Sequence, residues 1–414
     1  MISSMAADHA IWPKEDDAIF GLAAKAQEAI KKYGKENVID STLGALADDN
    51  GDLICMKTVY DELKSMPNAC FAAYAQVAGQ PDFLEAVQEA CFKEFRPDAY
   101  IKAVATPGGT GSVRHTIYNY TNPGDTILVS DWYWKPYVTI SEEFGRKVAF
   151  YKLFNEKNEF NIESFKENFE TLLNKQKRLV AIINSPAQNP TGYSLSDEEW
   201  VEVINIMKEN AKDQNNKIIL FIDVAYIDFA GKENERRKFF KLFSNLPENI
   251  LVVVGYSLSK GYTMYGMRLG AAICISSNKD IADEFYYSCS HSSRANWSNC
   301  NRAAMEVMSR ISKDPAKLKA YEEEKAIYKS MLQKRAEAFV KAANEVDLEI
   351  LPYRDGFFIS IPCDNAKEIS DKLIEQNLFL VPLKKGLRFA VCAVSEDKCK
   401  IAPAMIKKIM DEIK

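Results

Sequence analysis

Short, largely apolar runs in the centre of this 414-residue chain constrain its fold more than any other feature. Each run is closed by polar or small residues, and helical segments separate them; the runs are 178–183, 218–222, 250–254 and 269–275. Apolar runs without alternation suit strands that are covered on both faces, as in parallel sheets. The pattern therefore predicts an α/β domain over about 51–312, with a mainly parallel sheet flanked by helices.

A long, charged, helical stretch follows at about 316–346. Its helical spacing predicts a buried stripe made of Leu318, Tyr321, Ile327, Met331, Leu332 and Phe339. A helix of this length is expected to span two domains. We therefore expect three parts: an N-terminal segment 1–50, a large domain 51–312, and a small α+β domain 313–414 begun by this helix. The first 50 residues have no core of their own and are expected to pack on the small domain.

Composition excludes several classes of function. The net charge is −5 with no basic stripe, so nucleic acid is not an expected partner. No apolar run approaches the roughly 20 residues of a membrane span, and residues 1–13 lack the features of a signal peptide. Nine cysteines without a Cys-x-x-Cys pair indicate reduced thiols and a cytoplasmic protein. Three histidines, none paired at helical spacing, give no reason to expect a metal site.

The motif Ser257-Leu-Ser-Lys260 directly follows the apolar run 250–254. The carboxyl end of a buried strand is where α/β proteins place their chemistry. A lone lysine is usually a solvated surface charge. A lysine in a partly apolar pocket near other cations has a lowered pKa, however, and becomes a neutral nucleophile. Arg268, eight residues further on, is suited to pair with a phosphate, together with Ser257.

Asp223 closes another apolar run and allows two interpretations. Aspartate after a strand commonly caps a turn or helix, but it can also pair with a protonated pyridine nitrogen and keep that ring an electron sink. Tyr226, three residues on, is placed to donate its phenol to a ring oxygen. Asn189, in Asn-Pro-Thr-Gly192, is either a turn residue or a second ligand of that oxygen.

The glycine-rich segment Gly108-Gly-Thr-Gly-Ser112 is the candidate phosphate loop. Glycines let the backbone approach a ligand closely. If a helix starts near Ser112, its free N–H groups face the loop and favour phosphate, and Thr110 and Ser112 could add hydroxyl donors. An ordinary glycine turn is the alternative. Trp134 follows another apolar run, so it is either a core aromatic or a ring stacked on a cofactor.

Two arginines are candidates for binding carboxylates. Arg388 lies within the apolar run 386–392, where an arginine is costly unless it is paired. A substrate α-carboxylate, held by two parallel N–H bonds, is the natural partner. Arg294, in Ser293-Arg-Ala-Asn-Trp-Ser-Asn299, is a second candidate, with a surface arginine as the alternative.

Taken together, these motifs resemble the fold-type I pyridoxal phosphate-dependent aminotransferases of class I, close to the aspartate and aromatic aminotransferases. The resemblance covers about 40–392 in order and spacing. It implies a large domain with a mainly parallel seven-stranded sheet, a small α+β domain, and a homodimer with shared active sites. One departure concerns Tyr137, which stands where the family often has a histidine behind the ring-binding aspartate.

The resemblance also implies roles for individual residues. Lys260 would form the Schiff base and carry the proton, with Asp223 and Tyr226 as its catalytic partners. The residues that would bind pyridoxal 5′-phosphate are Gly109, Thr110, Trp134, Asn189, Asp223, Tyr226, Ser257, Lys260, Arg268 and, from a neighbouring subunit, Tyr74. The residues that would bind substrate are Gly44, Trp134, Asn189, Arg294 and Arg388.

The reaction implied is a ping-pong transamination through pyridoxamine phosphate in amino acid metabolism. Arg294 favours aspartate, glutamate and 2-oxoglutarate as substrates, since the matching arginine holds a side-chain carboxylate. Aromatic amino acids are the nearest alternative. A lyase or decarboxylase on the same fold is a further alternative, because it would keep Lys260, Asp223 and Arg388. A non-enzymatic regulatory role would predict an added DNA-binding segment, and none is visible before residue 40.

Overall fold

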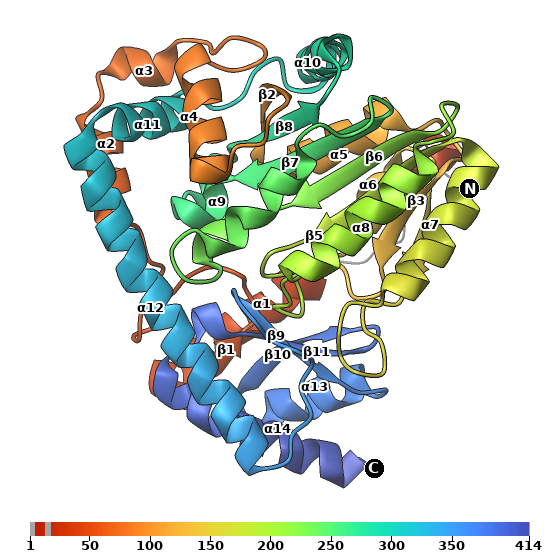
Figure 1. Cartoon of the computed structure of the whole chain (residues 1–414). Helices are drawn as coiled ribbons and strands as arrows, with labels where there is room; N and C mark the ends of the chain where they lie inside the picture. The colour runs from red at the N-terminus through yellow and green to blue at the C-terminus, as the bar shows by residue number, and fades with distance from the viewer. Residues whose placement is uncertain (1–4, 13–17, 414) are drawn as a thin grey trace.

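The computed structural model describes residues 5–12 and 18–413 and contains two sheets (Figure 1). The larger sheet has seven strands in the order β2-β8-β7-β6-β5-β3-β4. Their bounds are β2 (Tyr100–Thr106), β3 (Thr126–Ser130), β4 (Lys147–Tyr151), β5 (Arg178–Asn184), β6 (Lys217–Asp223), β7 (Ile250–Ser257) and β8 (Gly270–Ser276). Strands β3 to β7 pair in parallel, and β8 runs antiparallel to both β2 and β7. The predicted α/β architecture with a mainly parallel seven-stranded sheet is confirmed.

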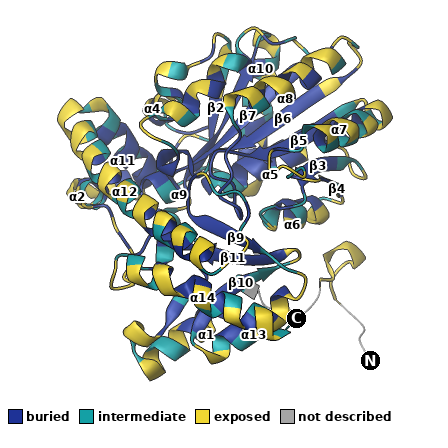
Figure 2. Ribbon diagram, turned by 60° about the horizontal axis from the view of Figure 1, so that its bottom comes forward, coloured by how far each residue is buried: buried dark blue, intermediate teal, exposed yellow. Residues whose placement is uncertain are grey.

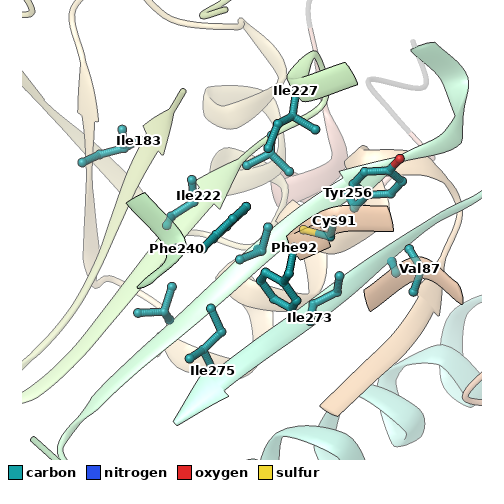
Figure 3. Close-up of a cluster of buried hydrophobic side chains, with 14 of the residues drawn as sticks. Val87, Cys91, Phe92, Ile183, Ile222, Ile227, Phe240, Tyr256, Ile273 and Ile275 are labelled. Atoms are coloured by element: carbon teal, nitrogen blue, oxygen red, sulfur yellow. The ribbon is translucent and has the colours of Figure 1, made fainter. Parts of the chain in front are cut away.

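Helices cover both faces of this sheet because its central strands are apolar on both. In β7, Val252 and Val254 point into one core and Val253 into the other. Helices α5 (Gly108–Tyr120), α6 (Pro136–Glu143) and α10 (Lys279–Asn296) cover the face of Val253. The opposite face is covered by α2 (Lys57–Ser65), α4 (Pro81–Phe92), α7 (Ile162–Gln176), α8 (Asp197–Asn210) and α11 (Arg302–Lys313), with the short α3 (Asn68–Ala72) beside them. Figure 3 shows part of this second core, and Figure 2 shows the strands buried between helices with exposed outer sides.

The smaller sheet joins the two ends of the chain. Its order is β1-β10-β11-β9, and its strands are β1 (Ile39–Ser41), β9 (Phe358–Pro362), β10 (Leu378–Leu383) and β11 (Gly386–Ala390). Strand β1 pairs in parallel with β10. Its helices are α1 (Ala18–Tyr33), α13 (Ala366–Glu375) and α14 (Glu396–Ile413); α1 packs Leu22 and Ala26 against Phe379 and Val381. Of the expected N-terminal segment, residues 1–4 and 13–17 lie outside the described residues.

Helix α12 (Pro315–Glu345) runs along both sheets (Figure 1). Tyr321 belongs to the core of the larger sheet, whereas Leu332 and Phe339 belong to the core of the smaller one. The predicted stripe is wrong at Ile327, which is 66% exposed, because the buried residues Tyr321, Lys325, Leu332 and Phe339 follow one helical face and Ile327 lies outside that spacing. The two cores support the division into 1–50, 51–312 and 313–414, which we retain as a proposal. In the part of the chain that the structure describes, no helix is both long and apolar enough to cross a bilayer.

Candidate active site

A cavity of about 180 Å³ opens where β5, β6 and β7 end. Parallel strands bring their carboxyl ends to one edge of the sheet, which is where ligands bind in such folds. The residues lining the cavity are Gly109, Thr110, Trp134, Asn184, Asn189, Asp223, Ala225, Tyr226, Ser257, Ser259, Lys260, Tyr265 and Arg268. Every residue predicted to bind the cofactor is among them except Tyr74.

Lys260 lies on the short helix α9 (Leu258–Gly261), immediately after β7. Its Nζ donates a 2.6 Å hydrogen bond to the carbonyl oxygen of Gly44, which comes from the N-terminal segment. Burial, aided by the nearby guanidinium groups of Arg388 and Arg268, lowers the pKa of Lys260 to about 8. A lysine with this pKa is neutral often enough near pH 7 to act as a nucleophile and base.

Asp223 ends β6 and is buried. Its Oδ2 accepts a 2.7 Å hydrogen bond from the phenol of Tyr137, and its Oδ1 accepts one of 3.1 Å from the backbone N–H of Ala225. Burial raises the pKa of Asp223, while these two hydrogen bonds oppose the rise. No cationic side chain of the described residues lies within 4 Å of it, so the carboxylate is available to a cationic ring nitrogen.

The start of α5 and Arg268 form a cradle with the chemistry of a phosphate site. An added Cβ at Gly108, where φ is +69°, would lie 2.6 Å from Arg268 Nη2, so the guanidinium rests directly on the glycine turn. Arg268 Nη1 donates to Ser259 Oγ at 3.2 Å, and within residues 5–12 and 18–413 no carboxylate pairs with Arg268. Free helix N–H groups and a guanidinium without a carboxylate partner can only donate, and the two serine hydroxyls can donate as well, which fits the phosphate of pyridoxal phosphate.

Arg388 is the buried cation beside this cradle, and it is only 4% exposed. Its Nη2 donates to the carbonyl oxygen of Thr42 at 2.7 Å and its Nη1 to Asn189 Oδ1 at 3.3 Å, whereas its buried Nε has no partner. Its guanidinium lies 4.4 Å from the ring centre of Phe358. The same ring explains why residue 44 is a glycine, since an added Cβ at Gly44 would lie 2.5 Å from the ring of Phe358. A cation without a carboxylate is costly to bury, which fits a site that binds the substrate's α-carboxylate.

Two predicted residues lie away from the cavity in the single chain. Tyr74 is 87% exposed, and Arg294 lies at the exposed end of α10. Arg294 Nη1 donates only to Ser298 Oγ, at 3.2 Å. The structure of one chain therefore does not bring either residue to Lys260.

Asn184 and Tyr265 are among the lining residues that were missed from the sequence. Asn184 donates to the carbonyl oxygen of Asp223 at 2.8 Å and accepts from the backbone N–H of Asn189 at 2.7 Å, so it links two of the predicted residues. Its position at the end of β5, where it pairs in register with Asp223, is the feature that could have identified it. The ring of Tyr265 lies 4.9 Å from Lys260 Nζ, and its oxygen accepts from the backbone N–H of Leu46. Nothing in the sequence pointed to Tyr265, because it belongs to a short 3-10 helix (Tyr265–Met267) after α9 and outside the strand ends.

Comparison with known proteins identifies the family of this chain. The model of the family described as aminotransferase class I and II matches residues 36–406. A solved structure of an aminotransferase from Anaerococcus prevotii is 43% identical, with a TM-score of 0.96, and the match covers 99% of this chain and 100% of that one. The aromatic-amino-acid aminotransferase of Paracoccus denitrificans is 26% identical over 268 residues, 64% of either protein. The aspartate aminotransferase of Salmonella typhi is 23% identical over 335 residues, 80% of this chain and 81% of the relative. This chain belongs to the class I and II aminotransferases, a family of transaminases that depend on pyridoxal phosphate.

Proposed function

We propose that this aminotransferase moves the amino group of aspartate or glutamate to a 2-oxo acid such as 2-oxoglutarate, in two alternating half-reactions. The observation that supports an amino-acid substrate is the environment of Arg388. Its guanidinium is buried, its Nε has no partner, and no carboxylate lies near it in the described chain. Arg294 carries the dicarboxylic preference, because it is an exposed cation bonded only to a serine hydroxyl.

Four residues have a defined part in this reaction: Lys260, Asp223 and Arg268 from the cavity lining, and Arg388, which contacts the lining residue Asn189. Pyridoxal phosphate, when bound, supplies an electron sink for the negative charge that develops at the substrate Cα. Lys260, with a pKa near 8, would be the base that removes the proton from the substrate Cα and delivers it to the carbon on the other side of the amino nitrogen. Asp223 presents its carboxylate to the ring nitrogen, Arg388 orients the substrate by its α-carboxylate, and Arg268 holds the phosphate.

We further propose that two copies of the chain form a homodimer with shared active sites. The exposed positions of Tyr74 and Arg294 support this arrangement, since neither has a part to play in the cavity of its own chain. None of the nine cysteines, all of which the structure describes, forms a disulfide. That observation supports a reducing compartment such as the cytoplasm.

An aromatic substrate is the alternative, because a relative of similar identity is named an aromatic-amino-acid aminotransferase. The visible absorbance of the holoenzyme distinguishes the two. We expect aspartate or glutamate to abolish the visible band and 2-oxoglutarate to restore it. A response to phenylalanine alone would assign the aromatic group. Release of pyruvate and ammonia without an acceptor would instead indicate a lyase.

A further inference from the structure

A group of buried polar side chains lies next to the turn that carries Lys260 and outside the cavity. This rear cluster consists of Asp228, Arg237, Tyr256, Tyr321 and Lys325. Tyr256 comes from β7, just before the motif of Lys260, and it appears in Figure 3 with its phenol oxygen. Tyr321 and Lys325 come from α12 and lie one helical turn apart, so they share a face of that helix.

Asp228 is the anion at the centre of the rear cluster. Its Oδ2 accepts a 2.7 Å hydrogen bond from Tyr256, and its Oδ1 accepts one of 2.7 Å from Arg237 Nη2. Lys325 Nζ lies 3.6 Å from Oδ1. Burial alone would raise the pKa of Asp228, but Lys325 and Arg237 outweigh it and hold this pKa well below its usual range. Asp228 is therefore a charged, fixed group with cations on one side.

The fixed carboxylate of Asp228 rests against the residue that follows Lys260. An added Cβ on Gly261 would lie 2.3 Å from Asp228 Oδ2. Real Cβ atoms do not approach so closely, so the turn leaves no room for a side chain at this position. The backbone immediately after Lys260 is thereby confined from one direction.

Tyr321 confines the same backbone through a hydrogen bond. Its phenol donates to the carbonyl oxygen of Gly261 at 3.0 Å. Its ring stacks on that of Tyr262, with centres 4.6 Å apart and planes 21° apart. One side chain of α12 thus contacts both residues that follow Lys260.

We propose that Tyr321 is a positioning residue that holds the Lys260 turn at its working distance from the substrate. Lys260 must reach two carbon atoms in turn, and a displacement of about 1 Å at a reacting group can cost about 100-fold in rate. The turn has only four residues, too few to hold its own geometry by helical hydrogen bonds. The proposal rests on the role of Lys260 in the proposed function.

The test is Tyr321→Phe in the holoenzyme, because this change removes one hydroxyl and keeps the ring on Tyr262. Tyr328→Phe is the matched control, since Tyr328 lies on the same helix about two turns further on and outside the rear cluster. Two quantities are measured: kcat and KM for the amino donor, and amide hydrogen exchange of Tyr262 and Thr263. These two amides donate to carbonyl oxygens of the turn, at Leu258 and Lys260, and so report its opening.

We expect Tyr321→Phe to lower kcat at least tenfold, to leave KM within twofold, and to speed exchange of the two amides at least tenfold. Tyr328→Phe should change none of these. Unchanged exchange, or an equal loss of kcat in the control, overturns the proposal. If the wild-type protein shows no transamination, the proposed function fails, and the exchange rates still decide whether Tyr321 holds the turn.

Discussion

The phenol of Tyr137 donates a 2.7 Å hydrogen bond to Oδ2 of Asp223, and both side chains are buried. Burial, and then the adjacent carboxylate, raises the pKa of Tyr137 well above its usual value. The phenol therefore keeps its proton throughout the physiological pH range. The donor that lies behind Asp223 therefore does not change its charge over this range.

Replacing Tyr137 with phenylalanine should weaken activity, most strongly in acid. Without this donor the pKa of Asp223, already raised by burial, rises further, so the carboxylate is lost as the pH falls through that higher value. We expect kcat to fall about tenfold at pH 7 and the acid limb of the pH–rate profile to move to higher pH. Tyr137→His, which restores a donor, is the control. An unmoved acid limb would contradict the assignment.

Lys260 predicts a pH-dependent stability of the cofactor-free protein. Its folded pKa of about 8 lies below the unfolded value of 10.5, so the unfolded chain binds more protons between these values and stability rises with pH there. Lys260→Met removes the buried charge. This variant should be more stable than the wild type by roughly 1–3 kcal/mol below pH 8, and the difference should vanish above about pH 10.5. Denaturant unfolding of both proteins at pH 7 and pH 10.5 measures this difference in the free energy of unfolding. A difference that does not depend on pH would contradict the assignment of a lowered pKa to Lys260.

Arg388→Lys should impair binding of every amino acid. A lysine keeps the charge but loses the planar fork that holds a carboxylate by two N–H bonds. It would also leave the carbonyl oxygen of Thr42 without its donor. We expect KM to rise about 100-fold for aspartate and phenylalanine alike, since two charge-assisted hydrogen bonds are weakened. Steady-state kinetics with both substrates measures this, and an effect on one substrate alone would place Arg388 elsewhere.

Arg294→Leu separates the two substrate classes. If Arg294 binds the distal carboxylate, kcat/KM should fall about 100-fold for aspartate and stay within threefold for phenylalanine. A neutral ring makes no ion pair that the substitution could remove. The ratio of kcat/KM for aspartate to kcat/KM for phenylalanine reports specificity, because a general loss of activity would lower both values equally. An equal loss for both would show that Arg294 does not choose the substrate.

The strand ends were predictable because their physical signal is local. Lys260 and Asp223 each follow a wholly apolar run, and parallel pairing brings such ends to one edge. The same local pattern does not identify Asn184, although Asn184 pairs in register with Asp223 in the neighbouring strand. Knowledge of which strands are neighbours was needed to recognise it.

Other parts were not predictable because they depend on distant contacts. Nothing near Tyr265 in the sequence indicates that it contacts Leu46 and lies over Lys260. Ile327 was predicted in the core, but the buried face of the helix passes through Lys325, whose partner Asp228 is distant in the sequence, and Ile327 faces outward. Arg294 is exposed in one chain, and a single sequence does not show how a second copy would pack against it.

The hydrogen bond from Arg388 to Thr42 joins residues 346 positions apart. Strand β1, which carries the chain toward Thr42, likewise has its partner in β10 near the other end. A ribosome that adds 5–20 residues per second needs roughly 20–70 s to make that interval. The first strand must therefore wait unpaired through most of synthesis, and the carboxylate site can assemble only after nearly the whole polypeptide has emerged.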